Sequence, residues 1–146
     1  MNTTKRFRRP RERGAVSVEA ALLIPVFVLV AALGTAGWRI WWTGTQVQAA
    51  AESAARAASQ AGTTTQANLL ISQVVAADLA TAGVHCSQLT TQADVSAVAA
   101  VAGNTGTVTV TVTCTVGMND LLVPGLPGSV TVRGDASEAI DPFARR

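Results

Sequence analysis

The chain has 146 residues, of which 49% are apolar, 14% charged and 4% aromatic. This length is typical of one domain, and the aliphatic content is too high for a disordered chain. One histidine, two cysteines and no tyrosine leave few groups for chemistry. Because catalytic sites bring several such groups together, we expect neither an enzyme nor a bound cofactor.

Residues 1–14 are predicted to be a basic cytoplasmic leader. Lysine and arginine outnumber the one acid of this segment, Glu12, whereas acids outnumber arginines in residues 39–146. The net charge of +2 therefore conceals an asymmetry between the two ends of the chain. A basic arm can bind nucleic acid, but this one adjoins an apolar segment of membrane length. We expect no nucleic-acid partner, and the positive-inside rule places the leader in the cytoplasm.

Residues 15–38 are predicted to form a transmembrane helix. Glu19 is the only charged residue in this segment, and the stretch from Ala20 to Trp38 is uncharged. As a helix, that stretch would be roughly 28 Å long, close to the roughly 30 Å hydrocarbon core of a bilayer. We expect a single-pass protein of the cell membrane, with its N-terminus cytoplasmic and its C-terminal domain extracytoplasmic.

Three tryptophans and one arginine lie close together at the far end of this segment: Trp38, Arg39, Trp41 and Trp42. Tryptophan is enriched at membrane–water interfaces, and an arginine near a helix end can extend to the headgroups. We therefore expect these residues to be interface anchors. A secretory signal peptide cleaved after Ala36 is the alternative, but the apolar run is longer than usual for one and is followed by tryptophans.

Glu19 is an unusual residue so near the start of an apolar segment. A carboxylate costs about 2.5–3.5 kcal/mol at the bilayer centre and less near the interface, and the segment holds no base that could pair with it. Cleavage after Gly14 would make Glu19 the fifth residue and free an α-amine on Ala15. We predict a processing site at Gly14 and Ala15, and we expect Glu19 to meet the α-amine of a neighbouring subunit in the membrane.

Two further segments have helical character. Thr45–Ala61 is rich in alanine and lacks glycine and proline, so a nearly continuous helix over Ala15–Ala61 would form a stalk of roughly 70 Å. Thr63–Thr65 has the composition of a capping turn. Gln66–Ala82 is predicted to be a second helix that ends at Gly83.

The pattern then changes to a period of two. Thr107–Val116 alternates threonine with apolar residues and predicts a strand with its valines facing inward. We expect Asp94–Ala102 to pair with it across a turn at residues 103–106, and Ser129–Ala139 to form a third strand after a loop at residues 118–128. The predicted class is α+β: a long N-terminal transmembrane and stalk helix, a second helix and a small three-stranded antiparallel sheet.

Cys86 and Cys114 both follow the predicted membrane helix, in a compartment where thiols oxidise. We predict a disulfide between them, which would contribute about 3–4 kcal/mol in the chain-entropy model. His85 is the only other soft ligand, and a structural zinc ion needs four, so we expect no metal site and interpret His85 as a polar residue in a turn. No phosphate-binding or paired-carboxylate motif is present, and we expect no catalytic residues and no small-molecule substrate.

The segments around Gly14 resemble a known family. RGAVSVEAALLIPVFVLV at residues 13–30, followed by TQVQAAAESAARAASQAG at residues 45–62, is similar to TadE-like proteins, minor pseudopilins of the tight-adherence (Flp) pilus assembly system. The tail, with GTVTVTVTCTVG at residues 106–117, is similar to actinobacterial members. The resemblance implies a pilin-like α+β fold and cleavage by a prepilin peptidase. It also implies partners among other pilin or pseudopilin subunits and inner-membrane assembly proteins.

The sequence therefore predicts a membrane-anchored structural component in the assembly of a tight-adherence pilus or related secretion apparatus. Its expected regions are the leader at 1–14, the transmembrane helix at 15–38, a membrane-proximal alanine-rich helix at 39–62 and an exported α+β head at 63–146. Two alternatives stay open. One is an uncleaved single-pass envelope protein whose exported domain binds a partner, and the other is a soluble domain released after Ala36.

Overall fold

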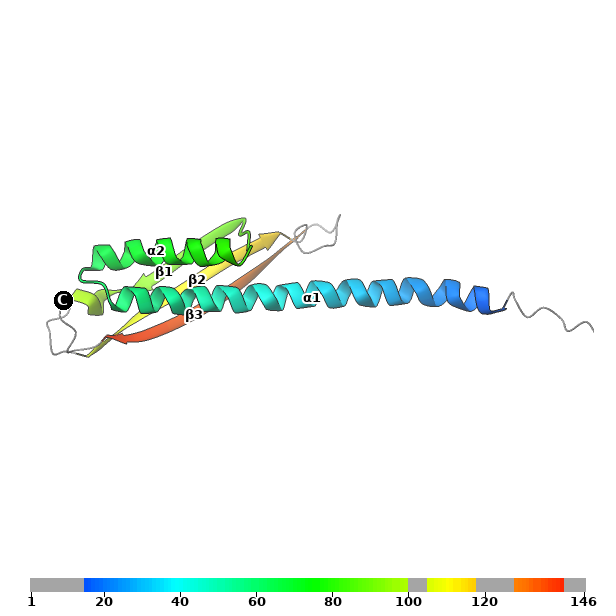
Figure 1. The fold of residues 1–146 in the computed structure, drawn as a ribbon, viewed down its shortest axis with the longest axis horizontal. Helices are drawn as coiled ribbons and strands as arrows, with labels where there is room; N and C mark the ends of the chain where they lie inside the picture. Colours follow the sequence, from blue (N-terminus) through cyan, green and yellow to red (C-terminus); the bar gives the residue numbers. More distant parts are fainter. Residues whose placement is uncertain (1–14, 100–104, 118–127, 141–146) are drawn as a thin grey trace, which may run out of the picture. The chain divides into compact units, whose positions relative to one another are not determined.

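The structure, a computed structural model, describes residues 15–99, 105–117 and 128–140. Its elements in chain order are α1 (Ala15–Ser59), α2 (Thr64–Thr81), β1 (Gln88–Asp94), the short 3-10 helix η1 (Ser96–Ala99), β2 (Gly106–Gly117) and β3 (Ser129–Ile140) (Figure 1). Two helices and a three-stranded antiparallel sheet confirm the α+β class. The chain divides into two compact units, with the boundary in the sequence between Thr35 and Ala36.

α1 confirms the long N-terminal helix and ends two residues before the predicted Ala61. Pro25 and Gly44 both lie inside it, so neither residue ends the helix. α1 contributes residues to both units. Its apolar part up to Thr35 belongs to the first unit, and its alanine-rich part belongs to the second.

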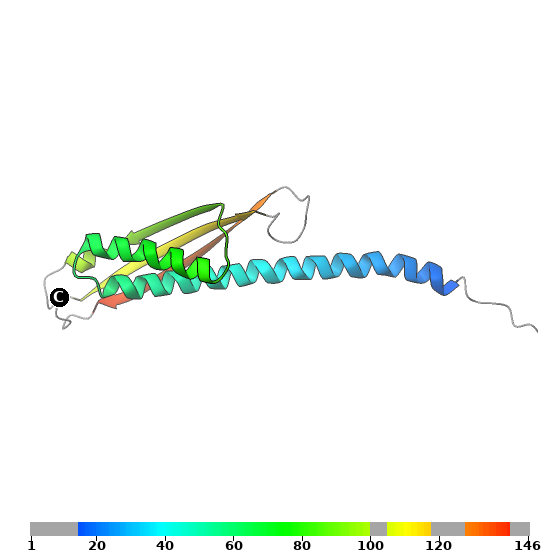
Figure 2. The same ribbon diagram turned by 45° about the horizontal axis from the view of Figure 1, so that its top comes forward.

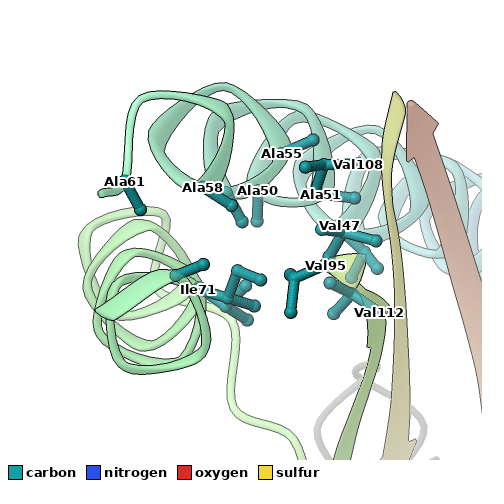
Figure 3. Close-up of a cluster of buried hydrophobic side chains, with 14 of the residues drawn as sticks. Val47, Ala50, Ala51, Ala55, Ala58, Ala61, Ile71, Val95, Val108 and Val112 are labelled. Atoms are coloured by element: carbon teal, nitrogen blue, oxygen red, sulfur yellow. The ribbon is translucent and has the colours of Figure 1, made fainter. Parts of the chain in front are cut away.

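The alanine-rich part of α1 packs through small side chains. Its buried residues recur at helical spacing along one face: Val47, Ala50, Ala51, Ala54, Ala55 and Ala58. In Figure 3 several of them point toward Ile71 of α2 and toward Val108 and Val112 of β2. Because the distance between packed elements depends on the side chains at the contact, a face of alanines lets the α1 backbone approach its neighbours closely.

α2 begins and ends with the signals expected of a helix. The hydroxyl of Thr63 caps it by accepting a hydrogen bond from the N–H of Gln66 at 3.2 Å, and the helix starts two residues earlier than predicted. Its end agrees with the prediction to one residue, and Gly83 follows with a φ of 68°, a left-handed conformation that suits glycine. One buried residue per turn faces the core: Ala67, Ile71, Val75 and Leu79.

β2 is the central strand of the sheet, antiparallel to β1 on one side and to β3 on the other. β2 and β3 confirm two predicted strands to within one residue at each end. The predicted inward face of β2 is buried: Val108, Val110, Val112, Cys114 and Val116. α2 and the C-terminal part of α1 lie side by side on this face (Figures 1 and 2), so the core forms between one helical layer and one sheet layer.

The prediction of a first strand at Asp94–Ala102 is wrong. The structure forms β1 earlier, at Gln88–Asp94, and residues Ser96–Ala99 form η1. Every β1 side chain except Thr91 is exposed, so this edge strand lacks the alternation of apolar and polar residues by which strands are found in a sequence. The predicted turn at residues 103–106 and the predicted loop at residues 118–128 lie largely outside the described residues.

Asp94 marks the change from β1 to η1. Its carboxylate accepts a hydrogen bond from the N–H of Ser96 at 3.0 Å, and hydrogen bonds from Ser96 hold the pKa of Asp94 below its ordinary value. Such a local bond favours a turn over a continued strand. Val98 is therefore buried from a turn of helix, and Val95 from the residue between β1 and that turn.

β3 meets the backbone of α1 at Gly134. A Cβ atom on this buried glycine would lie 2.7 Å from the carbonyl oxygen of Val47 and 2.8 Å from the Cα of Gln48. The side-chain amide of Gln48 donates to the carbonyl of Asp135 at 2.9 Å and accepts from its N–H at 3.1 Å. Gln48 therefore satisfies backbone groups on the outer edge of β3, as a further strand would.

The outer face of the sheet carries threonines and one ion pair. Asp135 accepts hydrogen bonds from the guanidinium of Arg133, the shortest at 2.8 Å, and from the hydroxyl of Thr111 at 2.6 Å. These bonds, those from Arg133 first, hold the pKa of Asp135 below its ordinary value of 3.8. The charged form of Asp135 is thus favoured in the folded chain.

Replacing Asp135 by Asn should lower stability at neutral pH and abolish one part of its pH dependence. Because the folded pKa is depressed, the contribution of Asp135 is present above the unfolded value of 3.8 and is lost as the pH falls through the folded value. The urea midpoints of the parent chain and the Asp135→Asn variant should therefore converge between pH 5 and about pH 2. Arg133→Gln should remove most of this pH dependence of stability. If the urea midpoints of the parent chain and Asp135→Asn still differ at low pH, the depressed pKa of Asp135 does not explain the difference.

Candidate membrane anchor and the adjoining groove

The first part of α1 has the properties of a membrane-spanning helix. Among the described residues it is the one helix long and apolar enough to cross a membrane, with a mean hydropathy of 2.3 in its most apolar window. None of that window is buried, and large side chains such as Leu22 and Phe27, both 69% exposed, are uncovered. A helix that is apolar on all sides needs an apolar environment. The finding indicates a single-pass insertion into a membrane.

The predicted processing site lies at the start of this helix. Gly14 lies outside the described residues, and Ala15 is the first residue of α1. Glu19 follows at the beginning of the second turn, with its side chain exposed. Cleavage after Gly14 and the pairing of Glu19 with an α-amine stay predictions.

The predicted interface anchors lie in consecutive turns of α1. Trp38, Trp41 and Trp42 are 62%, 59% and 47% exposed, and the ring centroids of Trp38 and Trp41 are 5.3 Å apart. Trp38, Arg39 and Trp42 line one hollow of the second unit, whereas Trp41 lines another together with Arg133. The cluster thus presents aromatic rings on two sides of the helix, and its role as an anchor stays a prediction.

The larger hollow is a groove of about 680 Å³ within the second unit. Three segments line it: the anchor region of α1, the connection from α2 to β1 and the end of β2. Its lining residues are Trp38, Arg39, Trp42, Thr43, Ala82, Gly83, Val84, His85 and Val116. His85, which we expected in a turn, lies in the connection from α2 to β1. It lines the same groove as Arg39.

The Cys86–Cys114 disulfide fixes one side of the groove and confirms the predicted pairing. Cys114 is fully buried in the valine face of β2, and its Cα lies 5.4 Å from that of Cys86. Backbone hydrogen bonds hold the same connection, from Val84 N–H to the carbonyl of Leu79 at 2.9 Å and from Ser87 N–H to the carbonyl of Thr115 at 2.8 Å. The disulfide and these bonds hold the segment before β1 at both of its ends.

The described residues hold no group of three or more histidine, cysteine, aspartate or glutamate side chains that could bind a metal ion. Both cysteines are in the disulfide. Within the second unit, the structure brings Trp38 and Trp42 of α1 to the lining of the larger groove.

A comparison with known protein families finds a match in the first part of the chain. Residues 14–56 match the family model described as TadE-like protein, which confirms the resemblance and covers α1 as far as Arg56. No curated protein and no solved structure matches the chain. The match indicates a component associated with the Tad pilus.

Proposed function

We propose that this TadE-like chain is a minor pseudopilin, a membrane-anchored structural component in the assembly of a tight-adherence (Flp) pilus or a related secretion apparatus. One observation carries the proposal: the segment that matches the family begins at Gly14 and contains Glu19 and the uncovered apolar helix. In this proposal residues 1–14 are cytoplasmic, residues 15–38 span the membrane, and the alanine-rich helix at 39–62 leads to an extracytoplasmic head at 63–146.

The proposed mechanism begins with proteolysis. A prepilin peptidase hydrolyses the peptide bond after Gly14 at the cytoplasmic face, and the new α-amine on Ala15 carries a positive charge. Glu19 pairs with the corresponding α-amine of a neighbouring pilin or pseudopilin in the membrane, where an unpaired carboxylate is costly. The pairing selects the register of adjacent helices, and inner-membrane assembly proteins hold the subunits while the head makes contacts outside.

Gly14→Val should block maturation. A peptidase site that accepts glycine leaves no room for a branched side chain, so the variant should keep its leader and be heavier than the mature chain by about 1.8 kDa, the mass of 14 residues. The measurement is intact mass and N-terminal peptide mapping of membrane-extracted protein. Gly34→Val, inside α1 at a position where an added Cβ meets nothing within 4 Å, should mature normally. A parent chain that retains Met1 would instead support the uncleaved envelope protein.

Glu19→Ala should leave the protein in the membrane and weaken its association with pilin subunits. Loss of a carboxylate that pairs within the bilayer should reduce co-purification about tenfold or more, as expected from the cost of an unpaired charge there. The control is Glu52→Ala, which removes an exposed acid from the part of α1 beyond the apolar segment. Equal co-purification of pilin subunits with the parent chain and with Glu19→Ala would count against the pairing.

A further inference from the structure

The groove beside Trp38 and Trp42 combines aromatic rings and basic side chains in one hollow. We propose that it binds the headgroup of an anionic phospholipid from the membrane that α1 enters. This inference depends on the membrane anchoring proposed above, and not on cleavage after Gly14 or on pilus assembly. It goes beyond the predicted role of these residues as interface anchors, because an anchor at a membrane surface needs no specific ligand.

The charge of the groove suits a phosphodiester. Among the residues that the structure describes, the titratable side chains that line it, Arg39 and His85, are both basic. A guanidinium donates charge-assisted hydrogen bonds to phosphate oxygens, often two at once, and the imidazole of a histidine offers a further donor. The indole N–H groups of Trp38 and Trp42 and the hydroxyl of Thr43 add neutral donors.

The position of the groove along the chain suits a headgroup. The uncharged run of α1 ends at Trp38, and Arg39 is the first charge after it. A run of this length, roughly 28 Å as a helix, brings the residues after it to the level where headgroups lie. The apolar lining residues Ala82, Val84 and Val116 can contact the glycerol part of a lipid whose phosphate lies beside Arg39.

The shape of the groove is held by the fold. Its volume of about 680 Å³ lies within the range of roughly 300–1,000 Å³ found for small-molecule sites. Gly83 turns the chain back after α2, and the Cys86–Cys114 disulfide ties the residue after His85 to β2. A site that is held in place before binding loses less entropy when its ligand binds.

The fluorescence of the three tryptophans of the chain, at positions 38, 41 and 42, reports directly on lipid near this site. The full chain would be reconstituted into phosphatidylcholine vesicles that contain phosphatidylglycerol. In one series the phosphatidylglycerol has brominated acyl chains, and in the matched series the phosphatidylcholine has them. The quenching constant of tryptophan fluorescence with brominated phosphatidylglycerol, divided by that with brominated phosphatidylcholine, measures the enrichment of anionic lipid around the tryptophans. We expect about fivefold enrichment, the effect of one basic side chain next to an anionic lipid.

A set of variants distinguishes binding of anionic lipid in the groove from non-specific attraction between anionic lipid and the cations of the chain. Arg39→Gln should bring the ratio close to one, Arg39→Lys should retain most of it, and His85→Ala should reduce it by about half. Arg56→Gln removes an exposed cation of α1 that does not line the groove and should change nothing. A ratio of one in the parent chain, or a high ratio unchanged in both Arg39→Gln and His85→Ala, would overturn the proposal. Failure of the chain to enter vesicles would instead refute the membrane anchoring itself.

Discussion

Removing the Cys86–Cys114 disulfide should lower the free energy of unfolding of the second unit by about 3–4 kcal/mol. The cross-link joins positions 28 residues apart in the sequence, so its loss frees a long loop in the unfolded chain. The suitable variant combines Cys86→Ala with Cys114→Val. A valine at position 114 continues the buried series of Val108, Val110 and Val112 and keeps the β2 face apolar.

Pulse proteolysis of the full chain in detergent, over a series of urea concentrations, would measure this loss. Dithiothreitol should lower the urea midpoint of the parent chain to that of the double variant and should leave the variant unchanged. This comparison separates the effect of the cross-link from that of the altered side chains. A double variant as stable as the oxidised parent would show that the disulfide does not stabilise the second unit.

Those parts of the fold that have a repeating pattern could be predicted from the sequence. Thr107–Val116 alternates without interruption because one face of β2 is buried and the other is not, so its strand and its orientation were both evident. The ends of α2 were evident for a similar reason, since Thr63 and Gly83 have side chains suited to the two ends of a helix. The disulfide followed from the presence of only two cysteines.

Features that depend on distant parts of the chain could not be predicted in this way. β1 is recognised only by its pairing with β2, because its side chains are exposed on both faces. Arg39 and His85 lie far apart in the sequence and share a groove only because α2 and the disulfide bring the second segment back. Gly134 resembled any other glycine of a strand until the backbone of α1 was placed against it.

Gly134→Ala should destabilise the second unit by about 2–4 kcal/mol. The added Cβ would lie 2.7 Å from the carbonyl oxygen of Val47, and 2.8 Å and 2.9 Å from the Cα and N atoms of Gln48. All three atoms belong to the helix backbone, so no side-chain rotation can relieve the overlap. α1 would have to move away from β3, which costs about 1–3 kcal/mol for overpacking and weakens the two hydrogen bonds between Gln48 and Asp135.

The matched control is Gly117→Ala at the end of β2, where an added Cβ meets nothing within 4 Å. Because alanine restricts the unfolded chain more than glycine does, this variant should be neutral or more stable by up to about 1 kcal/mol. Gln48→Ala should cost less than Gly134→Ala, since it removes two hydrogen bonds to Asp135 and one to Glu52 but leaves the packing of the two backbones intact. Equal urea midpoints for Gly134→Ala and Gly117→Ala would mean that α1 does not lie against β3 as closely as these distances require. If the two midpoints differ as expected, the alanine-rich helix is bound to the sheet by close backbone contact. The sheet and the alanine-rich part of α1 would then move as one body.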